Sequence, residues 1–443
     1  MISRFRQKQS KWAWVTVCGC LVITVLGVLL ATTSPSGVIA PAKDSSAALS
    51  AALLRAGLRP GTQFTPVTAS TLTVPEPVQG SDGRIHVAYE LLLLNVTALP
   101  VRVDQVQVLD ASTHEAVLNL TGTVLTAAFT PVGGPTGDED SDDPTAGARS
   151  STIPSSATWV VWLDVSLPAG LPVPRQLEHR VVGAIVPPGG AAPVPFDDVI
   201  KPVETSLHSA TVLTPPVKGG IWFMSEGCCS DDTHHRRGLA PVNGQLSVPQ
   251  RFAIDFFMLD NRMRTWAGDP SKVTSYFSYR QPVVAAAPGT VVDSEDGLPN
   301  STALPYPPKP PPIDQTVGNH VTVQIGPGLY VLYAHFDPGS VKVHIGEKVT
   351  RGELLGLIGT SGNSTTPHLH FQIMTTPEFF PTDSVPYVFD QFQLLGRVPD
   401  RIWDDNLGLQ PTGTLPFVPA EPSGTHRDQL PLDRAVVRFA STR

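Results

Sequence analysis

Prolines and glycines are too frequent in this chain for a helical protein. There are 45 prolines and 37 glycines among 443 residues. Proline lacks a backbone donor and glycine destabilises helix interiors, whereas both suit short strands joined by tight turns. Because a chain of this length exceeds what one hydrophobic core usually organises, two folded domains are expected. The sequence therefore predicts a mainly β protein with two domains and connecting segments.

The first forty residues are interpreted as a targeting segment and are kept out of the fold. Four basic residues between Arg4 and Lys11 precede an uncharged, mostly apolar stretch at 12–31, which is long enough to cross a bilayer as a helix. The weak small-residue pattern at 38–40 leaves open whether this segment is cleaved, and we favour a retained anchor. The rest of the chain is expected on the outer, periplasmic or extracellular side of the cytoplasmic membrane, or secreted if the segment is cleaved.

The remaining chain divides by its hydrophobic pattern. After a linker, apolar and polar residues alternate, as at Ile85, Val87 and Tyr89, which is typical of strands and predicts a β-sandwich. Prolines between 187 and 202 predict a stiff connection to a second domain. The expected boundaries are 1–40 for the signal or anchor, 41–70 for the linker, 71–203 for the sandwich, 215–395 for the second β domain, and 396–443 for a tail whose residues 435–439 form a possible closing strand.

The charge of the chain excludes one class of function. The formal net charge is -8, and no basic stripe of the kind that binds phosphate backbones is present. The acidic run at 138–143 lacks the spaced ligands and the glycine of a calcium-binding turn, and we interpret it as a solvated loop. The sequence therefore predicts no nucleic-acid binding.

The four cysteines do not form a disulfide framework. Cys18 and Cys20 lie inside the apolar N-terminal stretch. Cys228 and Cys229 are adjacent, and either a vicinal disulfide or two buried thiols is consistent with their position.

Histidines gather on predicted strands of the second domain. Segments 318–325 and 329–335 form a hairpin that places His335 at the end of its second strand. Further along, His368 and His370 are two residues apart, so a strand would place both imidazoles on one face. Such a pair can bind a single metal ion, or one ring can bind it while the other acts as an acid or base.

Asp255 is a carboxylate inside an apolar strand. Phe252, Ile254 and Phe256 occupy the alternate positions around it. A buried carboxylate needs a partner. Two partners are open at this point, an ion pair with Arg251 and a metal ion.

Five short motifs follow one another in the second domain: Gly318-Asn-His320, Tyr333-Ala-His335, the ten residues from Val343 to Gly352, Gly359-Thr-Ser-Gly-Asn-Ser364 and Pro367-His-Leu-His-Phe371. Taken together, they resemble the lysostaphin-type zinc metallopeptidases, a family of cell-wall endopeptidases with a small antiparallel β core. The resemblance covers about residues 220–395. It implies that Asp255 and His370 bind zinc, and that His335 and His368 are the catalytic imidazoles.

The third zinc ligand departs from the family pattern. The family has a histidine four residues before the aspartate, where this chain has Arg251, which offers no lone pair to a metal. The segment from Glu226 resembles a divergent branch of the family, and we predict His235 as the replacement ligand. The competing interpretation is that His234 and His235 belong to a solvated polar loop. Further residues expected to line the site are His234, Arg251, Tyr333 and Asn319.

The resemblance implies a zinc-dependent endopeptidase that hydrolyses peptide bonds outside the cytoplasmic membrane, with peptidoglycan cross-links as substrate. Three protein ligands would leave a fourth zinc position for water and lower the pKa of that water to about 7. His335 or His368 would take its proton while the other stabilises the oxyanion. The alternative, supported by Arg251, is a catalytically inactive module that binds cell-wall peptide or regulates a partner hydrolase.

Overall fold

The computed structural model describes residues 64–133, 150–229, 233–301, 311–399 and 414–441. The chain divides into two units, Met1–Phe64 and Thr65–Arg443, and the fold described below lies in the second. Within the described residues, every helix is too short or too polar to cross a bilayer. The predicted anchor at 12–31 lies outside these residues and stays a prediction. The prediction of a mainly β protein is confirmed.

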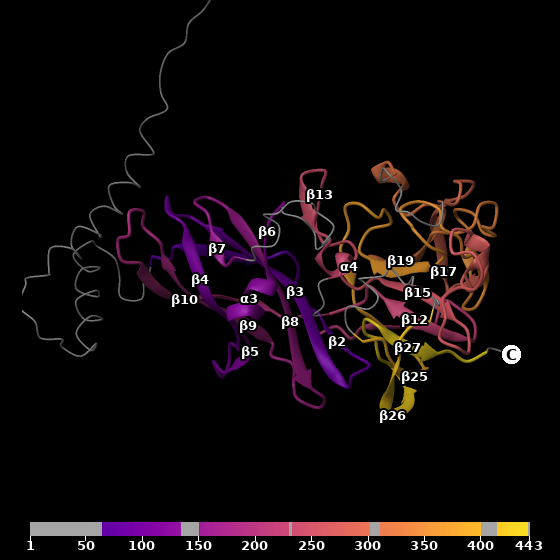
Figure 1. Ribbon diagram of the computed structural model, residues 1–443, viewed down its shortest axis with the longest axis horizontal. Coiled ribbons are helices and arrows are strands. Elements are labelled where there is room, and N and C mark those ends of the chain that lie inside the picture. The colour runs from indigo at the N-terminus through magenta and orange to yellow at the C-terminus, as the bar shows by residue number, and fades with distance from the viewer. Residues whose placement is uncertain (1–63, 134–149, 230–232, 302–310, 400–413, 442–443) are drawn as a thin grey trace, which may run out of the picture. The chain divides into compact units, whose positions relative to one another are not determined.

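The region up to residue 204 consists of two antiparallel sheets that share one hydrophobic core (Figure 1). The strands predicted here are present as β3, β4, β8 and β9, and their inward-facing side chains meet between the sheets as in a β-sandwich. A short helix, α3 (Gly122–Ala127), follows β5. The first sheet has the order β1 (Val67–Thr71), β3 (Arg84–Asn95), β8 (Thr158–Pro168) and β6 (Phe129–Pro131), with β2 (Pro77–Gln79) on β3. The second has the order β10 (Val194–Glu204), β9 (Gln176–Ile185), β4 (Val101–Asp110) and β5 (Ala116–Thr121), with β7 (Thr152–Ile153) on β4.

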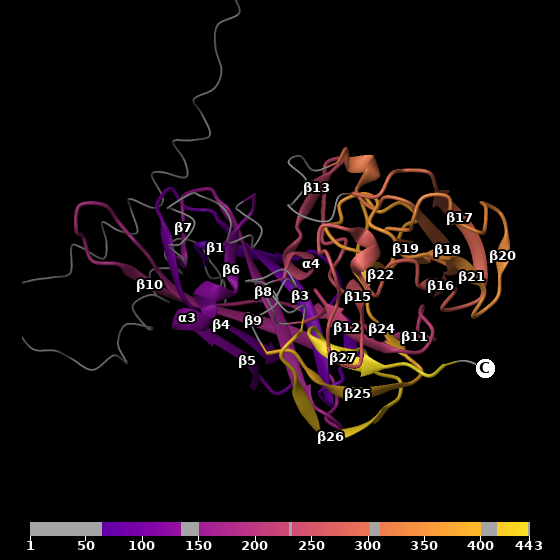
Figure 2. The same cartoon turned by 45° about the vertical axis from the view of Figure 1, so that its right-hand side comes forward.

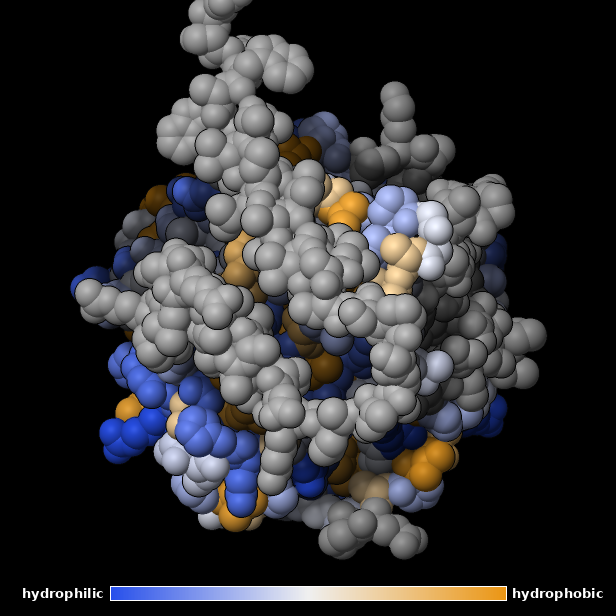
Figure 3. All heavy atoms as spheres, turned by 90° about the vertical axis from the view of Figure 1, so that its left-hand side faces the viewer, coloured by the Kyte–Doolittle hydropathy of each residue, from blue (hydrophilic) through white to orange (hydrophobic). Residues whose placement is uncertain are grey.

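The proline-rich connection predicted at 187–202 is wrong for most of its length, because residues 194–204 form strand β10. This strand pairs with β9 and lies at the edge of its sheet, where proline is tolerated because no further strand needs its missing N–H. The pairing register shifts between Ile200 and Val203, beside Pro202. Figure 3 looks from the side on which β10 lies in Figure 1, and hydrophilic and hydrophobic residues are intermixed on its coloured surface. The prolines, the register shift and the polar surroundings all protect this edge from pairing with another chain.

The second region is built on one large sheet, seen from two directions in Figures 1 and 2. The predicted hairpin is present as β18 and β19, and the predicted closing strand is β27, which pairs with both β12 and β25. The tail therefore belongs to this sheet. Its order is β20 (Lys348–Val349), β17 (Gly289–Glu295), β18 (His320–Gly326), β19 (Leu329–Ala334), β22 (Leu369–Met374), β15 (Ile254–Leu259), β12 (Ile221–Ser225), β27 (Ala435–Arg438), β25 (Phe392–Arg397) and β26 (Val418–His426), with β23 (Ser384–Val385) on β22.

Short pairs of strands and single turns complete the second region. Helix α4 spans only His234–Arg237, and two 3-10 turns lie at Val273–Ser275 and Ile313–Gln315. The paired strands are β11 (Thr211–Leu213) with β24 (Tyr387–Phe389), β13 (Ala240–Val242) with β14 (Gln245–Ser247), and β16 (Pro282–Val284) with β21 (Leu354–Leu357).

The sandwich and the second region are joined by buried contacts. Val78 and Ala88, on β2 and β3, belong to the hydrophobic core of the second region. The backbone of Ser81 donates a hydrogen bond of 2.9 Å to the carbonyl of Leu430. The two regions therefore share buried surface within the unit Thr65–Arg443.

Candidate metal centre

Strand pairing brings the predicted site residues together. Strand β22 lies between β15 and β19, and its His370 is the register partner of Asp255 on one side and of Ala334 on the other. His335 follows Ala334 directly, and His368 precedes the first residue of β22. Three neighbouring strands therefore deliver one carboxylate and three imidazoles to the same end of the sheet.

His235 joins this group from outside the sheet. It lies on α4, whose N-cap Thr233 accepts a hydrogen bond from the backbone of Arg236. Its Nε2 is 3.7 Å from Oδ2 of Asp255, and its ring centroid is 4.8 Å from that of His370 at an interplanar angle of 90°. The ligand atoms of His235, Asp255 and His370 all lie within 4.8 Å of one another. The structure thus places His235 at the site, and the solvated-loop interpretation is wrong for this residue, which is 2% exposed.

The two predicted catalytic imidazoles surround the same carboxylate. Nε2 of His368 is 3.3 Å from Oδ2 of Asp255, and the His368 ring centroid is 4.9 Å from that of His335. The His335 centroid is 5.8 Å from that of His370. All of these side chains are buried, so their interactions take place at low effective dielectric.

Backbone carbonyls fix the orientation of three of the four rings. Nδ1 of His235 donates to the carbonyl of Glu226 at 3.1 Å, Nδ1 of His335 to that of Ser361 at 2.8 Å, and Nδ1 of His368 to that of Thr366 at 2.7 Å. Because a carbonyl oxygen can only accept, the bonded nitrogen carries the proton and Nε2 keeps its lone pair. Each of these Nε2 atoms is therefore free to bind a metal ion or to accept a proton.

His370 is oriented in the opposite sense by Gln372. The Gln372 amide donates to the carbonyl of Pro249 at 2.9 Å, which turns its Oε1 toward Nε2 of His370, also at 2.9 Å. His370 therefore donates from Nε2, and its Nδ1, 3.0 Å from Oδ1 of Asp255, is the nitrogen available to a metal. This arrangement, in which a ligand histidine is held by a hydrogen bond from its second nitrogen, is common at metal sites.

The backbone carrying His335 is unusual. His335 has a φ of 68°, in the left-handed region that costs a non-glycine residue on the order of 1 kcal/mol. Its backbone N–H donates to Val317 and its carbonyl accepts from Gly359, which holds the residue in this conformation. Gly318, next to Val317, has a φ of 62°, and an added Cβ would lie 2.4 Å from the carbonyl group of Ser361, the acceptor for His335. The glycines of the motifs thus allow the close packing that aims His335 at the site.

Burial determines the charge states at the site. Removal from water lowers the pKa of His235 and of His335 well below the usual value, and it also lowers the pKa of His368. Burial favours the protonated form of Asp255, but the nearby imidazoles of His368 and His235 outweigh it and hold the pKa of the carboxyl well below its usual value. Neutral imidazoles around an ionised carboxylate are the protonation states that a metal ion requires.

The donor set fits a single zinc ion. His235, Asp255 and His370 supply two nitrogens and one oxygen, which matches the three protein ligands of a catalytic zinc site with one open position. Their separations, up to 4.8 Å, are slightly wider than the roughly 3–4 Å expected between donors at about 2.0–2.2 Å from a shared ion. The lone pairs of both imidazoles face the carboxylate, so a small closing movement would complete the site.

Arg251 does not pair with Asp255. Its guanidinium donates to the carboxylate of Glu90 at 2.6 Å and 2.9 Å and to that of Asp383 at 3.3 Å, and it contributes nothing to the cluster. The ion pair considered from the sequence is therefore wrong. The expectation that Arg251 lines the site is also wrong, because its charged group is bound to the sandwich.

The other three residues expected to line the site have different roles. The Tyr333 hydroxyl accepts a hydrogen bond from the backbone of Ala286 at 2.8 Å, so Tyr333 belongs to the core. Asn319 donates to the carbonyl of Phe336 at 3.0 Å and so supports the residue that follows His335. His234 is half exposed, and its ring contacts that of His235 with a centroid separation of 4.5 Å. Of these three residues, only His234 touches the cluster directly.

Gln372 was missed by the sequence analysis, although a signal for it was present. It lies two residues after His370, so the alternation that placed His368 and His370 on one face extends to it. Glu226, whose carbonyl orients His235, left no comparable signal. It has a φ of 60°, a backbone conformation that the sequence does not announce for glutamate.

A second group of possible metal ligands, His86, Asp164 and Cys229, is a poor site. Both His86 nitrogens are already bound, Nδ1 to Asp164 at 2.9 Å and Nε2 to Asp82 at 3.1 Å. Cys229 is bonded to Cys228 in a disulfide, so its sulfur is not a thiolate. The vicinal disulfide considered from the sequence is present in the structure.

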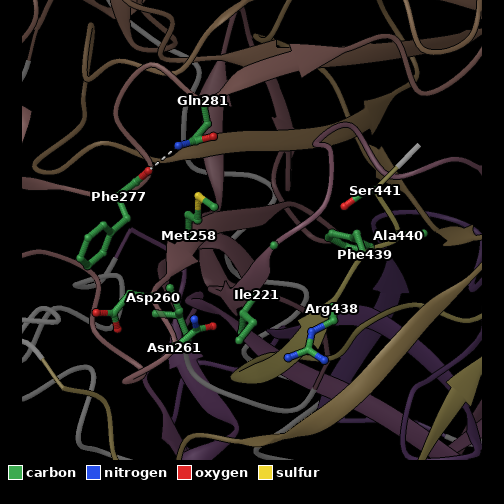
Figure 4. Close-up of a pocket in the computed structure, with 12 residues that line it drawn as sticks. Ile221, Met258, Asp260, Asn261, Phe277, Gln281, Arg438, Phe439, Ala440 and Ser441 are labelled. Carbon is green, nitrogen blue, oxygen red and sulfur yellow. Dashed lines mark hydrogen bonds between the residues drawn. The ribbon is translucent and has the colours of Figure 1, made fainter. Parts of the chain in front are cut away.

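A groove of about 700 Å³ lies away from the histidine cluster (Figure 4). Its labelled residues come from the ends of three neighbouring strands, such as Ile221 on β12, Met258 on β15 and Arg438 on β27. Asp255 lies four residues before Leu259 on β15, or about 13 Å along the strand. None of the twelve lining residues belongs to the cluster, so this groove is not the metal site.

A buried cluster of one carboxylate and four oriented imidazoles on an antiparallel sheet defines a mononuclear metal site of the hydrolytic type. Comparison with known proteins gives the family. Residues 273–380 match the model of peptidase family M23, and the chain thus carries a lysostaphin-type M23 peptidase domain. The match includes His335, His368 and His370, whereas His235 and Asp255 lie before it. The resemblance inferred from the motifs is confirmed.

Individual relatives match over shorter or more distant stretches. The peptidoglycan DD-endopeptidase ShyA of Vibrio cholerae serotype O1 is 39% identical over 57 residues, which are 13% of this chain and 13% of ShyA. The chain therefore matches well under two thirds of that relative. Among solved structures, the catalytic domain of lysostaphin from Staphylococcus simulans is 23% identical, with 33% of this chain and 80% of that chain covered and a TM-score of 0.20. The M23 metalloprotease pseudoalterin, described as from the deep sea, is 15% identical, with coverages of 50% and 96% and a TM-score of 0.24.

Proposed function

We propose that this protein is a zinc-dependent endopeptidase whose metal is held by His235, Asp255 and His370. The observation that carries the proposal is the common orientation of the imidazoles. Each donates from one nitrogen to a protein acceptor and presents the other toward the region around Asp255. A polar loop or a structural ion-pair cluster would not require this arrangement. It supports a site prepared for a cation and a reacting water molecule.

The two remaining imidazoles are placed for proton transfer. Zinc, when bound, would activate a water molecule and polarise the scissile carbonyl. His335 and His368 keep unprotonated Nε2 atoms beside the site, so one of them can accept the proton released by the attacking water. Once protonated, the same ring can donate to the oxyanion or to the departing amine, while the other ring stabilises charge in the transition state.

The substrate proposed is a peptide cross-link of peptidoglycan. ShyA, which shares a 57-residue segment with this chain, is described as a peptidoglycan DD-endopeptidase. With this substrate, the domains act on the outer side of the cytoplasmic membrane. The apolar segment at 12–31 then serves as a membrane anchor, or as a cleaved signal that leaves the protein secreted.

Digestion of purified peptidoglycan tests this proposal. The full chain, loaded with one equivalent of zinc, is incubated with insoluble peptidoglycan, and new amino termini and soluble muropeptides are measured. We expect release that stops on addition of a chelator and returns with zinc. His368→Gln is the matched control, because it keeps the three proposed ligands and removes one catalytic imidazole.

The alternative of an inactive, peptide-binding module has lost its main support. It relied on Arg251 at the family's ligand position, but Arg251 binds Glu90 while His235 occupies the cluster. The digestion experiment still separates the two functions. Sedimentation of the chain with peptidoglycan, without any new amino termini at any zinc concentration, would replace the endopeptidase by the binding module.

A further inference from the structure

Glu90 is a fully buried carboxylate of the sandwich whose partners come from the second region. It lies on β3 and is 0% exposed. Its Oε1 accepts from Arg236 at 2.6 Å, and its Oε2 accepts from Arg251 at 2.6 Å. Burial favours the protonated form, but Arg251 and Arg236 outweigh it and keep the pKa of Glu90 below its usual value. An ionised carboxylate in the sandwich therefore bridges two arginines of the peptidase region.

Arg236 connects this carboxylate to His235, its neighbour in sequence. Its guanidinium also donates to the sandwich carbonyls of Tyr89 at 3.2 Å and Leu163 at 2.9 Å, and to that of Cys229 at 2.9 Å. Helix α4 has only four residues, too few to hold a position by its own hydrogen bonds. In Figures 1 and 2 it lies between β3 and β15. The place of His235 is therefore set largely by the contacts of Arg236 with the sandwich.

Arg251 connects the same carboxylate to the strand of Asp255. It lies four residues before Asp255, and besides Glu90 it donates to the carbonyl of Ser384 at 3.1 Å. The segments that bring two of the three proposed ligands, His235 and Asp255, are thus attached to opposite oxygens of one side chain. No other residue in the described part of the chain forms printed ion pairs with both arginines.

Removing the charge of Glu90 would disturb this arrangement directly. Two buried guanidiniums would share a neutral partner, and buried cations left without a counter-ion are strongly destabilised. The least constrained response is a movement of α4, which is held at few points. Such a movement would carry His235 away from Asp255 while Asp255 and His370 stay paired on adjacent strands.

We propose that Glu90 is a positioning residue for the zinc site and that the sandwich is a part of that site rather than an independent module. Glu90 sets His235 through Arg236 and the Asp255 strand through Arg251. This inference rests on the proposed zinc site. It also explains how the chain accommodates arginine where the family has a ligand histidine, since Arg251 is used to join the two regions.

Metal binding by Glu90→Gln tests the inference, because glutamine keeps the size of the side chain and removes its charge. For the full-length wild type and variant, zinc affinity is measured by competition with a chromophoric chelator. The visible spectrum of the cobalt-substituted protein reports the ligand number, and thermal unfolding reports stability. We expect zinc affinity to fall about 10–100-fold and the cobalt spectrum to change, as for other residues that orient metal ligands. The matched control is His179→Gln, which alters a buried polar contact of the sandwich with Tyr89 and should lower Tm without changing either metal readout.

Three results would contradict or separate these proposals. An unchanged zinc affinity and cobalt spectrum in Glu90→Gln, whatever its Tm, would overturn the inference and leave the proposed function standing. A wild-type chain that binds no zinc would overturn both. If Glu90→Gln does not fold, Arg236→Lys decides in the same assays, because it keeps the positive charge but loses the fixed bonds to Tyr89 and Leu163. Wild-type metal binding by Arg236→Lys would then overturn the inference.

Discussion

Buried histidines occur in both regions of this protein, but they are used in different ways. In the sandwich, His86 binds a carboxylate with each nitrogen, and His179 is paired with the hydroxyl of Tyr89. In the peptidase region, four histidines each donate from one nitrogen to a protein acceptor and present the other toward the surroundings of Asp255. Burial of an imidazole is therefore not evidence of a metal site. What distinguishes the site is that unused lone pairs converge on one carboxylate.

The pKa values of the two sandwich histidines illustrate this contrast. Although burial opposes it, hydrogen bonds from Asp164 and Asp82 raise the pKa of His86 to about 9, so this ring is charged at neutral pH. Burial lowers the pKa of His179 to about 4, so this ring is neutral. The first ring is held by ion pairs and the second by packing. Neither has the orientation of a ligand.

The largest expected effect comes from removing a proposed ligand. Asp255→Ala or His370→Ala should weaken zinc binding on the order of 1000-fold, because a complete zinc site supplies roughly 10–16 kcal/mol and each ligand a substantial share. Elemental analysis after dialysis against a weak chelator measures the effect. His86→Gln is the control from the sandwich and should keep about one zinc per chain. Zinc that stays in His370→Ala but leaves His86→Gln would reverse the comparison.

The next effect concerns catalysis without loss of metal. His335→Gln and His368→Gln should each lower kcat/KM for peptidoglycan fragments by about 10²–10⁴, the usual contribution of a positioned acid or base. Zinc content should stay close to that of the wild type. Steady-state kinetics together with metal analysis checks both statements. A variant that loses its zinc along with its activity would show that its imidazole is a ligand.

A third effect concerns stability in the sandwich. Because the folded-state pKa of His86 lies above the usual 6.5, the stabilisation is fully present below pH 6.5 and is lost as the pH rises through about 9. The shift corresponds to roughly 3 kcal/mol. Urea unfolding of the metal-free wild type and His86→Gln should show a stability difference larger by this amount at pH 6 than at pH 10. An equal difference at both pH values would mean that His86 is not charged in the fold.

The smallest effect sharpens the role of orientation. Gln372→Leu removes the acceptor that fixes His370 and should lower zinc affinity about 10–100-fold while the fold is kept. Gln372→Glu, which retains an acceptor oxygen, should bind zinc at least as well as the wild type. Competition titrations with a chelator compare the three proteins. Equal affinity in Gln372→Leu would show that packing alone orients the ring.

Local patterns predicted much of the fold and of the site. Alternation of apolar residues located β3, β4, β8 and β9, and a spacing of two placed His368 and His370 on one face. The same reasoning failed for β10, because the prolines that usually end a strand are tolerated on a sheet edge. The local pattern was informative wherever the controlling interaction lies within a few residues.

Contacts between distant segments could not be predicted in this way. Glu90 is 146 residues from Arg236 and 161 from Arg251, and in the sequence it is only one more residue of an alternating strand. The interpretation of Arg251 failed for the same reason, because its partner lies in the other region. His235 was located by resemblance to a family branch, since a polar loop beside two arginines has no periodicity to analyse.

X-ray absorption at the zinc edge of the full-length protein tests the central claim most directly, because it identifies the atoms around the metal. The structure predicts about one zinc per chain with nitrogen and oxygen neighbours at about 2.0–2.2 Å, imidazole scattering, and no sulfur. This pattern should disappear in Asp255→Ala. A sulfur neighbour at about 2.3 Å would place the metal at Cys229, and an absence of bound zinc would contradict the account as a whole.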